Sequence, residues 1–253
     1  MPVNEILASF DLSAIDWLVT GFSALFIGAA KTGLSGISMV SVPLLAGVYG
    51  ARASAGIILP VLSAGDVLGV SYYHSHADWS HLAKLLPWTF AGILAGVATG
   101  SRLSEDGFRA MFSVVILVGV VLMTWQEVRG KHEVPQSRWF SAVAGLAGGF
   151  TTMIGNAAGP VMALYLLSMR LPKNVYIGTA AWFFMIVNLT KIPFHWFVWG
   201  TVTPRTLVLD ASMLPAVGIG AVVGIVVTKR IPERAYRIFI IVITALMALK
   251  LVI

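Results

Sequence analysis

Cysteine is absent from this chain, and charged residues make up only 11% of its 253 positions. Without cysteine, neither a disulfide framework nor a thiolate metal site can form. Soluble domains carry about 25% charged residues, whereas hydrophobic residues here reach 58% and the mean hydropathy is +0.87. The composition excludes an ordinary soluble domain. It predicts an all-α polytopic membrane protein, because helices satisfy their own backbone groups in lipid.

The sequence predicts neither a separate soluble domain nor a secretory leader. Its longest polar stretch, residues 126–138, is short enough to be a loop. The first thirteen residues contain Glu5 and Asp11 but no lysine or arginine, so the basic start of a secretory signal is missing. We therefore expect the first apolar run to be retained as a membrane span.

The net charge of +6 does not predict a nucleic-acid partner. Basic residues are scattered among loops between apolar runs, which is typical of membrane topology, so the predicted surroundings are a lipid bilayer. The sequence contains no nucleophile elbow, phosphate loop or zinc-protease motif. Neither an enzyme nor a cofactor is therefore predicted.

Apolar runs bounded by glycine, proline or charge divide the chain. They cover residues 13–31, 36–50, 53–73, 82–101, 107–125, 138–154, 158–169, 174–199, 206–228 and 235–253. A helix needs about 20 residues to span the hydrocarbon core. Runs 36–50 and 158–169 are short and follow glycine-containing breaks, so each is either a tilted short span or one arm of a re-entrant hairpin.

An internal repeat is visible when the chain is compared with itself. At an offset of 122 residues, the aligned pairs are Gly33 with Gly155, Gly56 with Gly178, and Asp66 with Asn188. At an offset of 128, they are Pro87 with Pro215, Gly96 with Gly224, Arg102 with Arg230, Glu105 with Glu233, and Arg109 with Arg237. We predict two homologous membrane repeats, residues 1–128 and 129–253, that form one integral membrane domain.

The parity of the runs predicts that the two repeats have inverted topology. Each repeat contains about five membrane helices or half-helices, and an odd number turns the second repeat upside down. With the N-terminus outside, ten lysines and arginines lie inside and five outside, which agrees with the positive-inside rule. A rival topology fuses residues 13–50 into one helix and gives eight spans in parallel halves. That helix would be about 57 Å long, against a hydrocarbon core of roughly 30 Å.

A break between two apolar runs is the strongest candidate for a site. It consists of Gly155, Asn156, Ala157, Ala158, Gly159 and Pro160. Glycine and proline disfavour a continuous helix, and backbone groups freed in a membrane must face protein, water or a ligand. Such interrupted helices often mark transporter binding sites.

The first repeat has a comparable break, which contains Gly33, Ser35 and Gly36. Free amides at a helix N-terminus, together with the helix dipole, favour an oxyanion. In inverted repeats, the two N-termini following these breaks would converge near the membrane midplane. The alternative is that the small residues only allow close helix packing.

Two lysines lie near these breaks. One precedes the first break directly, and the other lies in the apolar run 174–199 that follows the second break. A charged side chain near the bilayer centre costs at least about 2.5 kcal/mol, so Lys31 and Lys191 should face the protein interior or a wet cavity. The alternative is that they extend to a membrane interface. Together with the glycine breaks, they are predicted to bind a small anionic substrate.

Three further polar residues, Asp66, Asn188 and His195, lie within apolar runs. Asp66 could carry a coupling proton or cation, or could form a structural ion pair with Lys31. Asn188 is its equivalent in the second repeat and a candidate for substrate binding. His195 lies four residues after Lys191 on the same helix face. It is either a proton carrier or a hydrogen-bonding residue at an interface.

A histidine-rich connector offers a different function. His74, His76, Asp78 and His81 could bind a metal, as in a membrane-embedded metal-dependent protein. The cluster lies in a loop and lacks a second set of ligands, so a solvated connector is the preferred interpretation.

Several segments resemble a known family over nearly the whole chain. They are Thr152–Pro160, Leu164–Leu167, Gly178–Phe184 and Asn188–Phe194 in the second repeat, and Lys31–Gly36 and Val42–Leu44 in the first. These segments resemble the TauE/SafE family of membrane permeases. The resemblance implies a multi-pass protein of the bacterial inner membrane that exports sulfite, sulfoacetate or a related organosulfonate.

The function predicted from these features is secondary transport of a small anion by alternating access. An anion channel with the same pore chemistry is an alternative, and the metal-dependent protein is another. The sequence leaves the exact anion, the coupling ion and the oligomeric state open, and a homo-oligomer is compatible with it.

Overall fold

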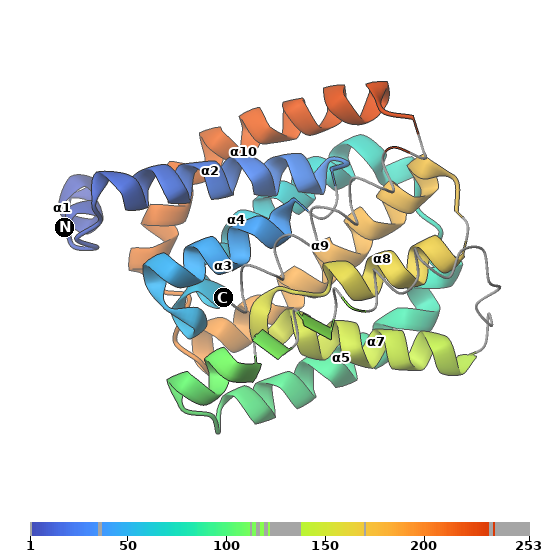
Figure 1. Ribbon diagram of the computed structural model, residues 1–253, viewed down its shortest axis with the longest axis horizontal. Coiled ribbons are helices and arrows are strands. Elements are labelled where there is room, and N and C mark those ends of the chain that lie inside the picture. The colour runs from blue at the N-terminus through green and yellow to red at the C-terminus, as the bar shows by residue number, and fades with distance from the viewer. Residues whose placement is uncertain are drawn as a thin grey trace.

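The computed structural model describes residues 2–34, 37–111, 113–114, 117–118, 121, 138–169, 171–232 and 235. These residues form helices and their connections, with no β-strand among them. The elements in chain order are α1 (Val3–Ala8), α2 (Ala14–Lys31), α3 (Ser38–Tyr49), α4 (Ala51–Tyr73), η1 (His74–His76), α5 (Trp79–Gly100), α7 (Arg138–Gly155), α8 (Gly159–Ser168), α9 (Lys173–Phe197) and α10 (Pro204–Arg230) (Figure 1). The predicted all-α class is confirmed.

Among the residues that the structure describes, five helical segments are long and apolar enough to cross a membrane. They are Ala14–Lys31, Ala51–His76, Trp79–Gly100, Lys173–Phe197 and Pro204–Arg230. By contrast, α3 has 12 residues and α8 has 10, which gives lengths of about 18 and 15 Å. Both are too short to span a core of roughly 30 Å without help from neighbouring segments. The two runs predicted to be short are therefore short helices.

The rival topology with one helix over residues 13–50 is wrong. Helix α2 ends at Lys31, and Gly33 adopts a positive φ of 141°. The Leu34 amide donates to the Ala29 carbonyl at 3.0 Å, and the Gly33 amide donates to the Ala30 carbonyl at 3.4 Å. This is the Schellman termination that glycine favours, because it has no Cβ to clash in this conformation. The chain then starts a new helix at Ser38.

Side-chain caps start several of the long helices where the sequence provides them. Ser13 and Asp16 form a reciprocal capping box at α2, and Thr203 caps α10 with Pro204 at its first turn. Asp78 accepts hydrogen bonds from the amides of Ser80 and His81 at the start of α5. Each cap satisfies amides that would otherwise have no intrahelical partner.

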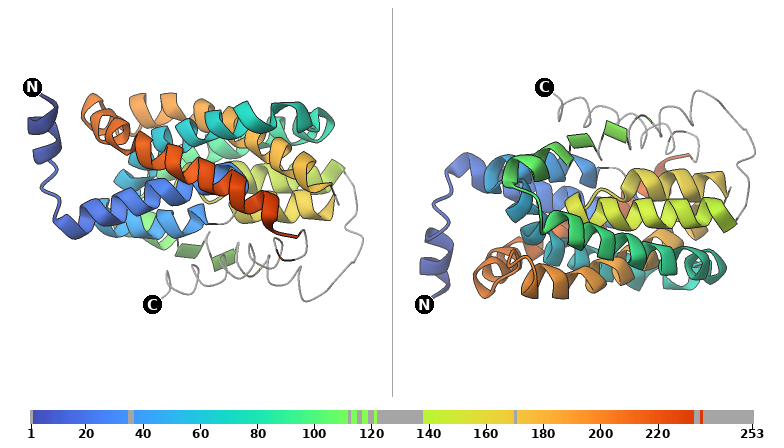
Figure 2. Two further views of the ribbon diagram at one scale, coloured as in Figure 1. Left: turned by 90° about the horizontal axis from the view of Figure 1, so that it is seen from above. Right: turned by 90° about the horizontal axis from the view of Figure 1, so that it is seen from below.

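Two helix pairs approach each other closely through glycines. Gly28 of α2 lies against the backbone of Val217 and Ala221 in α10, and Gly149 of α7 lies against that of Thr89 and Ile93 in α5. Figure 2 shows α10 crossing α2 on one side of the molecule and α5 beside α7 on the other. Small residues permit such close backbone contact, which is a common source of packing energy in membranes.

Helices α4 and α9 run antiparallel through the middle of the fold. Gly178, near the start of α9, lies against Tyr73 and His76 at the end of α4 and in η1, whereas Gly56 lies against Thr201, which follows α9. Among the five candidate spans, Ala51–His76 has the largest share of buried residues in its apolar part, 72%. One apolar core lies on the side of α5, α7 and α8, and another on the side of α2, α3 and α10. The polar residues of α4 and α9 lie between them.

Candidate functional site

The predicted break at residues 155–160 is present. Helix α7 ends at Gly155, and Asn156 has a left-handed φ of 53°, which asparagine tolerates better than most residues. The amides of Asn156 and Ala157 donate to the carbonyls of Thr152 at 2.9 Å and Thr151 at 3.3 Å. These two amides therefore cap α7. The N-terminus of α8 presents the amides of Ala158 and Gly159 instead.

Lys191 joins this break to helix α9. Its side chain is completely buried, at 0% exposure. Its Nζ donates to the Thr152 carbonyl and Oγ1, each at 3.0 Å, and to Asn156 Oδ1 at 2.5 Å. Asn156 also donates its Nδ2 to the Ala55 carbonyl of α4 at 2.9 Å. One buried lysine thus fixes the end of α7, the turn and two central helices relative to one another.

The second lysine forms a buried ion pair. Lys31 Nζ lies 2.7 Å from Asp66 Oδ1, and the two side chains are 8% and 0% exposed. The same ammonium lies 4.3 Å from the centre of the Phe184 ring, a favourable cation–π geometry. Asn188 Nδ2 donates to the other Asp66 oxygen at 2.6 Å. Of the two alternatives for Asp66, the structure contains the ion pair with Lys31.

The buried charges of this region do not balance when both lysines are protonated. Lys191 lies close enough to Lys31 and Asp66 for electrostatic interaction. Asp66 already neutralises Lys31, and the three acceptors of Lys191 are uncharged. A buried ion without a counter-charge is costly. While both lysines are protonated, the cluster of Lys31, Asp66 and Lys191 therefore carries a net charge of +1 that one anion would balance.

The ends of α2 and α7, which precede the two glycine breaks, contact α4 at different depths, and the convergence of the two helix N-termini that follow the breaks stays a prediction. The Lys31 carbonyl lies against Gly69 of α4, whereas Asn156 binds the Ala55 carbonyl of the same helix. These α4 positions are 14 residues apart, or about 21 Å along the axis. Packing of α2 and α7 along α4 sets this distance, and the local sequence does not encode it.

The region of the first break contributes Lys31 to the candidate site, whereas the amide of Gly33 is already used within α2. The amide of Gly33 caps α2, and a side chain at this position would overlap Thr228. The predicted site residues Ser35 and Gly36 lie outside the described residues. The candidate site is thus built mainly from the second break, with Lys31 and Asp66 beside it.

His195 is buried at the end of α9 and takes part in its termination. Its Nδ1 is 2.8 Å from Thr201 Oγ1, and its carbonyl accepts hydrogen bonds from the amides of Thr201 and Val202. The ring also packs edge-on against Trp199 at 4.9 Å. These contacts give His195 a structural role, and its role as a proton carrier stays a prediction.

The histidine-rich connector does not assemble into a ligand set. His74 Nδ1 is 3.2 Å from the Ser71 carbonyl, His76 Nδ1 is 3.2 Å from Ser75 Oγ, and His81 Nδ1 is 3.2 Å from the Tyr165 hydroxyl. Hydrogen bonds from Ser80 lower the pKa of the Asp78 carboxyl, which caps α5. In the part of the chain that the structure describes, no three histidine, aspartate or glutamate side chains are grouped for a metal.

Sequence reasoning missed two kinds of polar residue. Thr152 and Thr201, the partners of Lys191 and His195, are recognisable only once the helices are packed. Asp210 is a buried acid within the apolar run 206–228, at 4% exposure. An acid inside a membrane segment is itself a signal of function, so Asp210 could have been found from the sequence.

Comparison with known proteins gives one clear result. Residues 20–251 match the family model described as "Sulfite exporter TauE/SafE". Searches of curated proteins and of solved structures give no match. The family match covers almost the whole chain, including every residue of the candidate site.

Proposed function

This chain belongs to the TauE/SafE sulfite exporter family, and on that premise we propose that it is a secondary transporter that exports sulfite or an organosulfonate such as sulfoacetate. Family membership and the five apolar helices make it an integral membrane transporter. The substrate and the mechanism are the proposed part. The cell membrane is the expected location, with the N-terminus outside.

The observation that supports an anionic substrate best is the environment of Lys191. This lysine is fully buried and donates only to neutral acceptors, while the nearby Asp66 is paired with Lys31. Binding a small anion would supply the missing counter-charge. The amides of Ala158 and Gly159, at the N-terminus of α8, would add hydrogen bonds and the favourable end of a helix dipole.

An inverted repeat is part of the proposal, and contacts between helices support it. Gly92 packs on Leu146, and Gly220 packs on Leu25. An offset of 128 relates the two glycines, and an offset of 121 relates the two leucines. The contacts of Gly149 with Thr89 and Ile93 and of Gly28 with Val217 and Ala221 follow the same offsets. Equivalent contacts of this kind are expected if α2 and α10 in one pair correspond to α7 and α5 in the other.

Alternating access is the mechanism that this arrangement favours. Ala158 is 0% exposed and Lys191 is 0% exposed, so the candidate site is closed in this conformation. Movement of one repeat relative to the other would open the site to one side at a time. The short helices α3 and α8 can move without carrying a full membrane span. Transport would then proceed through conformations that expose Lys191 alternately to either face.

Flux measurements with purified protein in proteoliposomes test the proposal. We expect saturable transport of sulfite or sulfoacetate, stronger than that of taurine, whose ammonium group offsets its sulfonate charge. Non-saturating flux with a matching electrical current would favour the anion channel instead. The absence of flux for sulfite, sulfoacetate and sulfate alike would contradict the proposed substrate class.

A further inference from the structure

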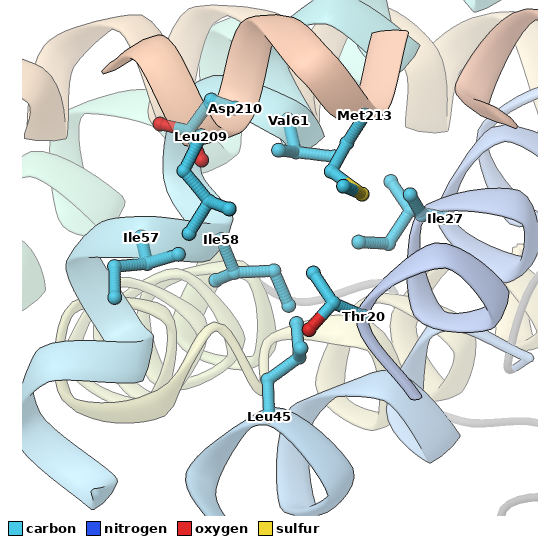
Figure 3. A pocket seen from close by; sticks show the side chains of 10 residues that line it. Thr20, Ile27, Leu45, Ile57, Ile58, Val61, Leu209, Asp210 and Met213 are labelled. Atoms are coloured by element: carbon cyan, nitrogen blue, oxygen red, sulfur yellow. The ribbon is translucent and has the colours of Figure 1, made fainter. Parts of the chain in front are cut away.

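A second polar position lies in a small cavity away from Lys191. The cavity has a volume of about 10 Å³, roughly the space that one water molecule requires. Its lining residues come from α2, α3, α4 and α10, and they are Thr20, Ala24, Ile27, Leu45, Ile57, Ile58, Val61, Leu209, Asp210 and Met213 (Figure 3). Only Thr20 and Asp210 among them have polar side chains.

Asp210 has no hydrogen-bond partner at this cavity. The residue is 4% exposed, and neither of its carboxyl oxygens has a partner among the described residues. Figure 3 shows its carboxyl group on the α10 side, next to Leu209, with Thr20 across the cavity. An unpaired carboxylate in apolar surroundings is very unfavourable. The carboxyl group is therefore expected to be neutral, with a proton bound, in this conformation.

The groups that face Asp210 do not supply a balancing charge. Tyr49 of α3 interacts electrostatically with Asp210 but is an acid itself, and its hydroxyl is 2.9 Å from Thr20 Oγ1 of α2. The α4 side is apolar at the cavity. Arg52, at the start of α4, pairs with Glu105, and Arg205 in α10 donates to the Ser9 carbonyl beyond α1. The arginines at the starts of α4 and α10 are thus bound elsewhere.

The lining of the cavity discriminates between a proton and a metal cation. A hard cation requires several oxygen ligands, whereas the side chains here provide oxygen only from Asp210 and Thr20. The cavity also has room for little more than a water molecule. A proton needs one acceptor and a water molecule that delivers it, and this cavity can provide both.

We propose that Asp210 is the site at which the transporter binds and releases a coupling proton, through the cavity between α2, α3, α4 and α10. In the step, a hydronium ion transfers one proton to the Asp210 carboxylate, which leaves a neutral carboxyl group and a water molecule. Release reverses this step when the cavity opens to bulk water. Because only the closed conformation disfavours the charged form, protonation biases the equilibrium between conformations. This inference rests on the proposed transport function.

A similar three-part arrangement lies at the opposite end of the fold. The Tyr165 hydroxyl of α8 is 3.2 Å from Ser141 Oγ of α7 and 3.2 Å from His81 Nδ1 of α5. Each place thus combines a hydroxyl group from α2 or α7, a tyrosine from the short helix α3 or α8, and a titratable residue from α10 or α5. The Asp210 cavity differs because its acid has no partner.

Two measurements on the full-length protein test the assignment. Infrared difference spectra across a pH titration should contain a band from a protonated carboxyl group that disappears in Asp210→Asn. In proteoliposomes, a pH gradient should drive anion accumulation in the wild type, and Asp210→Asn should reduce this accumulation at least tenfold while reducing anion exchange without a gradient much less. Asp11→Asn is the control, because Asp11 is exposed and its positive φ of 50° suits asparagine.

Each result bears on the inference separately from the proposed function. Wild-type protein without saturable anion flux would contradict the transport function, while the infrared band would still test the protonation of Asp210. Gradient-driven accumulation in Asp210→Asn that equals the wild type, or a carboxyl band that survives in this variant, would overturn the assignment. If Asp210→Asn does not fold, Asp210→Glu should shift the pH profile of transport. An unchanged profile in a folded Glu variant would also overturn it.

Discussion

Asn188 donates its side-chain amide to Asp66 across a distance of 2.6 Å, and the two residues occupy positions that an offset of 122 relates in the sequence. If an axis relates two halves of the chain, as proposed, equivalent residues can touch only near that axis. On that proposal, the contact places the Lys31–Asp66 ion pair close to the centre of the molecule, where the antiparallel helices α4 and α9 lie between the two apolar cores.

The buried ion pair should stabilise the fold only while both partners are present. Asp66→Asn leaves Lys31 without its counter-charge, and breaking a buried pair costs about 3–5 kcal/mol. Replacing both residues, as in Lys31→Met with Asp66→Asn, removes the unpaired charge and should restore much of the loss. Thermal unfolding in detergent measures both variants. A double variant that is less stable than Asp66→Asn alone would rule out this explanation.

Asn156→Asp should separate stability from transport. The new carboxylate would keep an oxygen within hydrogen-bond distance of Lys191 Nζ and would supply the negative charge that the site lacks. We expect a folded protein in which sulfite or sulfoacetate flux falls at least tenfold, because the internal charge competes with the anion. The matched control is Asn174→Asp, at an exposed position of α9. Wild-type flux in Asn156→Asp would show that charge at this position does not matter.

The glycines at the two close helix contacts should behave alike. A Cβ at Gly28 or Gly149 would overlap the backbone of α10 or α5, and overpacking of this kind costs about 1–3 kcal/mol. Gly28→Ala and Gly149→Ala should lower the unfolding temperature by similar amounts. Gly21→Ala and Gly218→Ala meet no atom within 4 Å and should be neutral or stabilising, since alanine favours helix. Equal stability of all four variants would contradict close packing at these glycines.

The cap at the start of α5 should give a pH-dependent contribution to stability. Hydrogen bonds from Ser80 lower the pKa of Asp78 in the folded protein. The stabilisation is therefore fully present above the unfolded pKa of about 3.9 and is lost as the pH falls through the lower folded pKa. Asp78→Ala should cost about 0.5–2 kcal/mol at neutral pH, and the difference from wild type should shrink below about pH 4. A difference that stays constant with pH would show that the charge of the cap is irrelevant.

The sequence predicted those features of the fold that local chemistry determines. Glycine and proline at Gly155–Pro160 interrupt a helix wherever they occur in this pattern, so the break could be located without a structure. The short helices α3 and α8 follow from the lengths of their apolar runs. The choice between two helices and one over residues 13–50 could also be made from length alone.

Features that depend on how helices pack could not be predicted in the same way. The difference in depth between the ends of α2 and α7 is visible only from their contacts with Gly69 and Ala55 along α4. The three acceptors of Lys191 come from α7 and its terminal turn, about 35–39 residues earlier in the chain. A sequence pattern identifies a buried lysine, but only the packed helices show that its partners are neutral.

The most direct test of the proposed site compares anion flux in Lys191→Gln and Lys84→Gln. Glutamine can still donate hydrogen bonds to Thr152 or Asn156 but carries no charge, and Lys84 is an exposed lysine of α5. In proteoliposomes with equal amounts of folded protein, Lys191→Gln should reduce saturable sulfite or sulfoacetate flux at least tenfold, while Lys84→Gln should match the wild type. Saturable flux in Lys191→Gln equal to that of the wild type would contradict an anion site at Lys191.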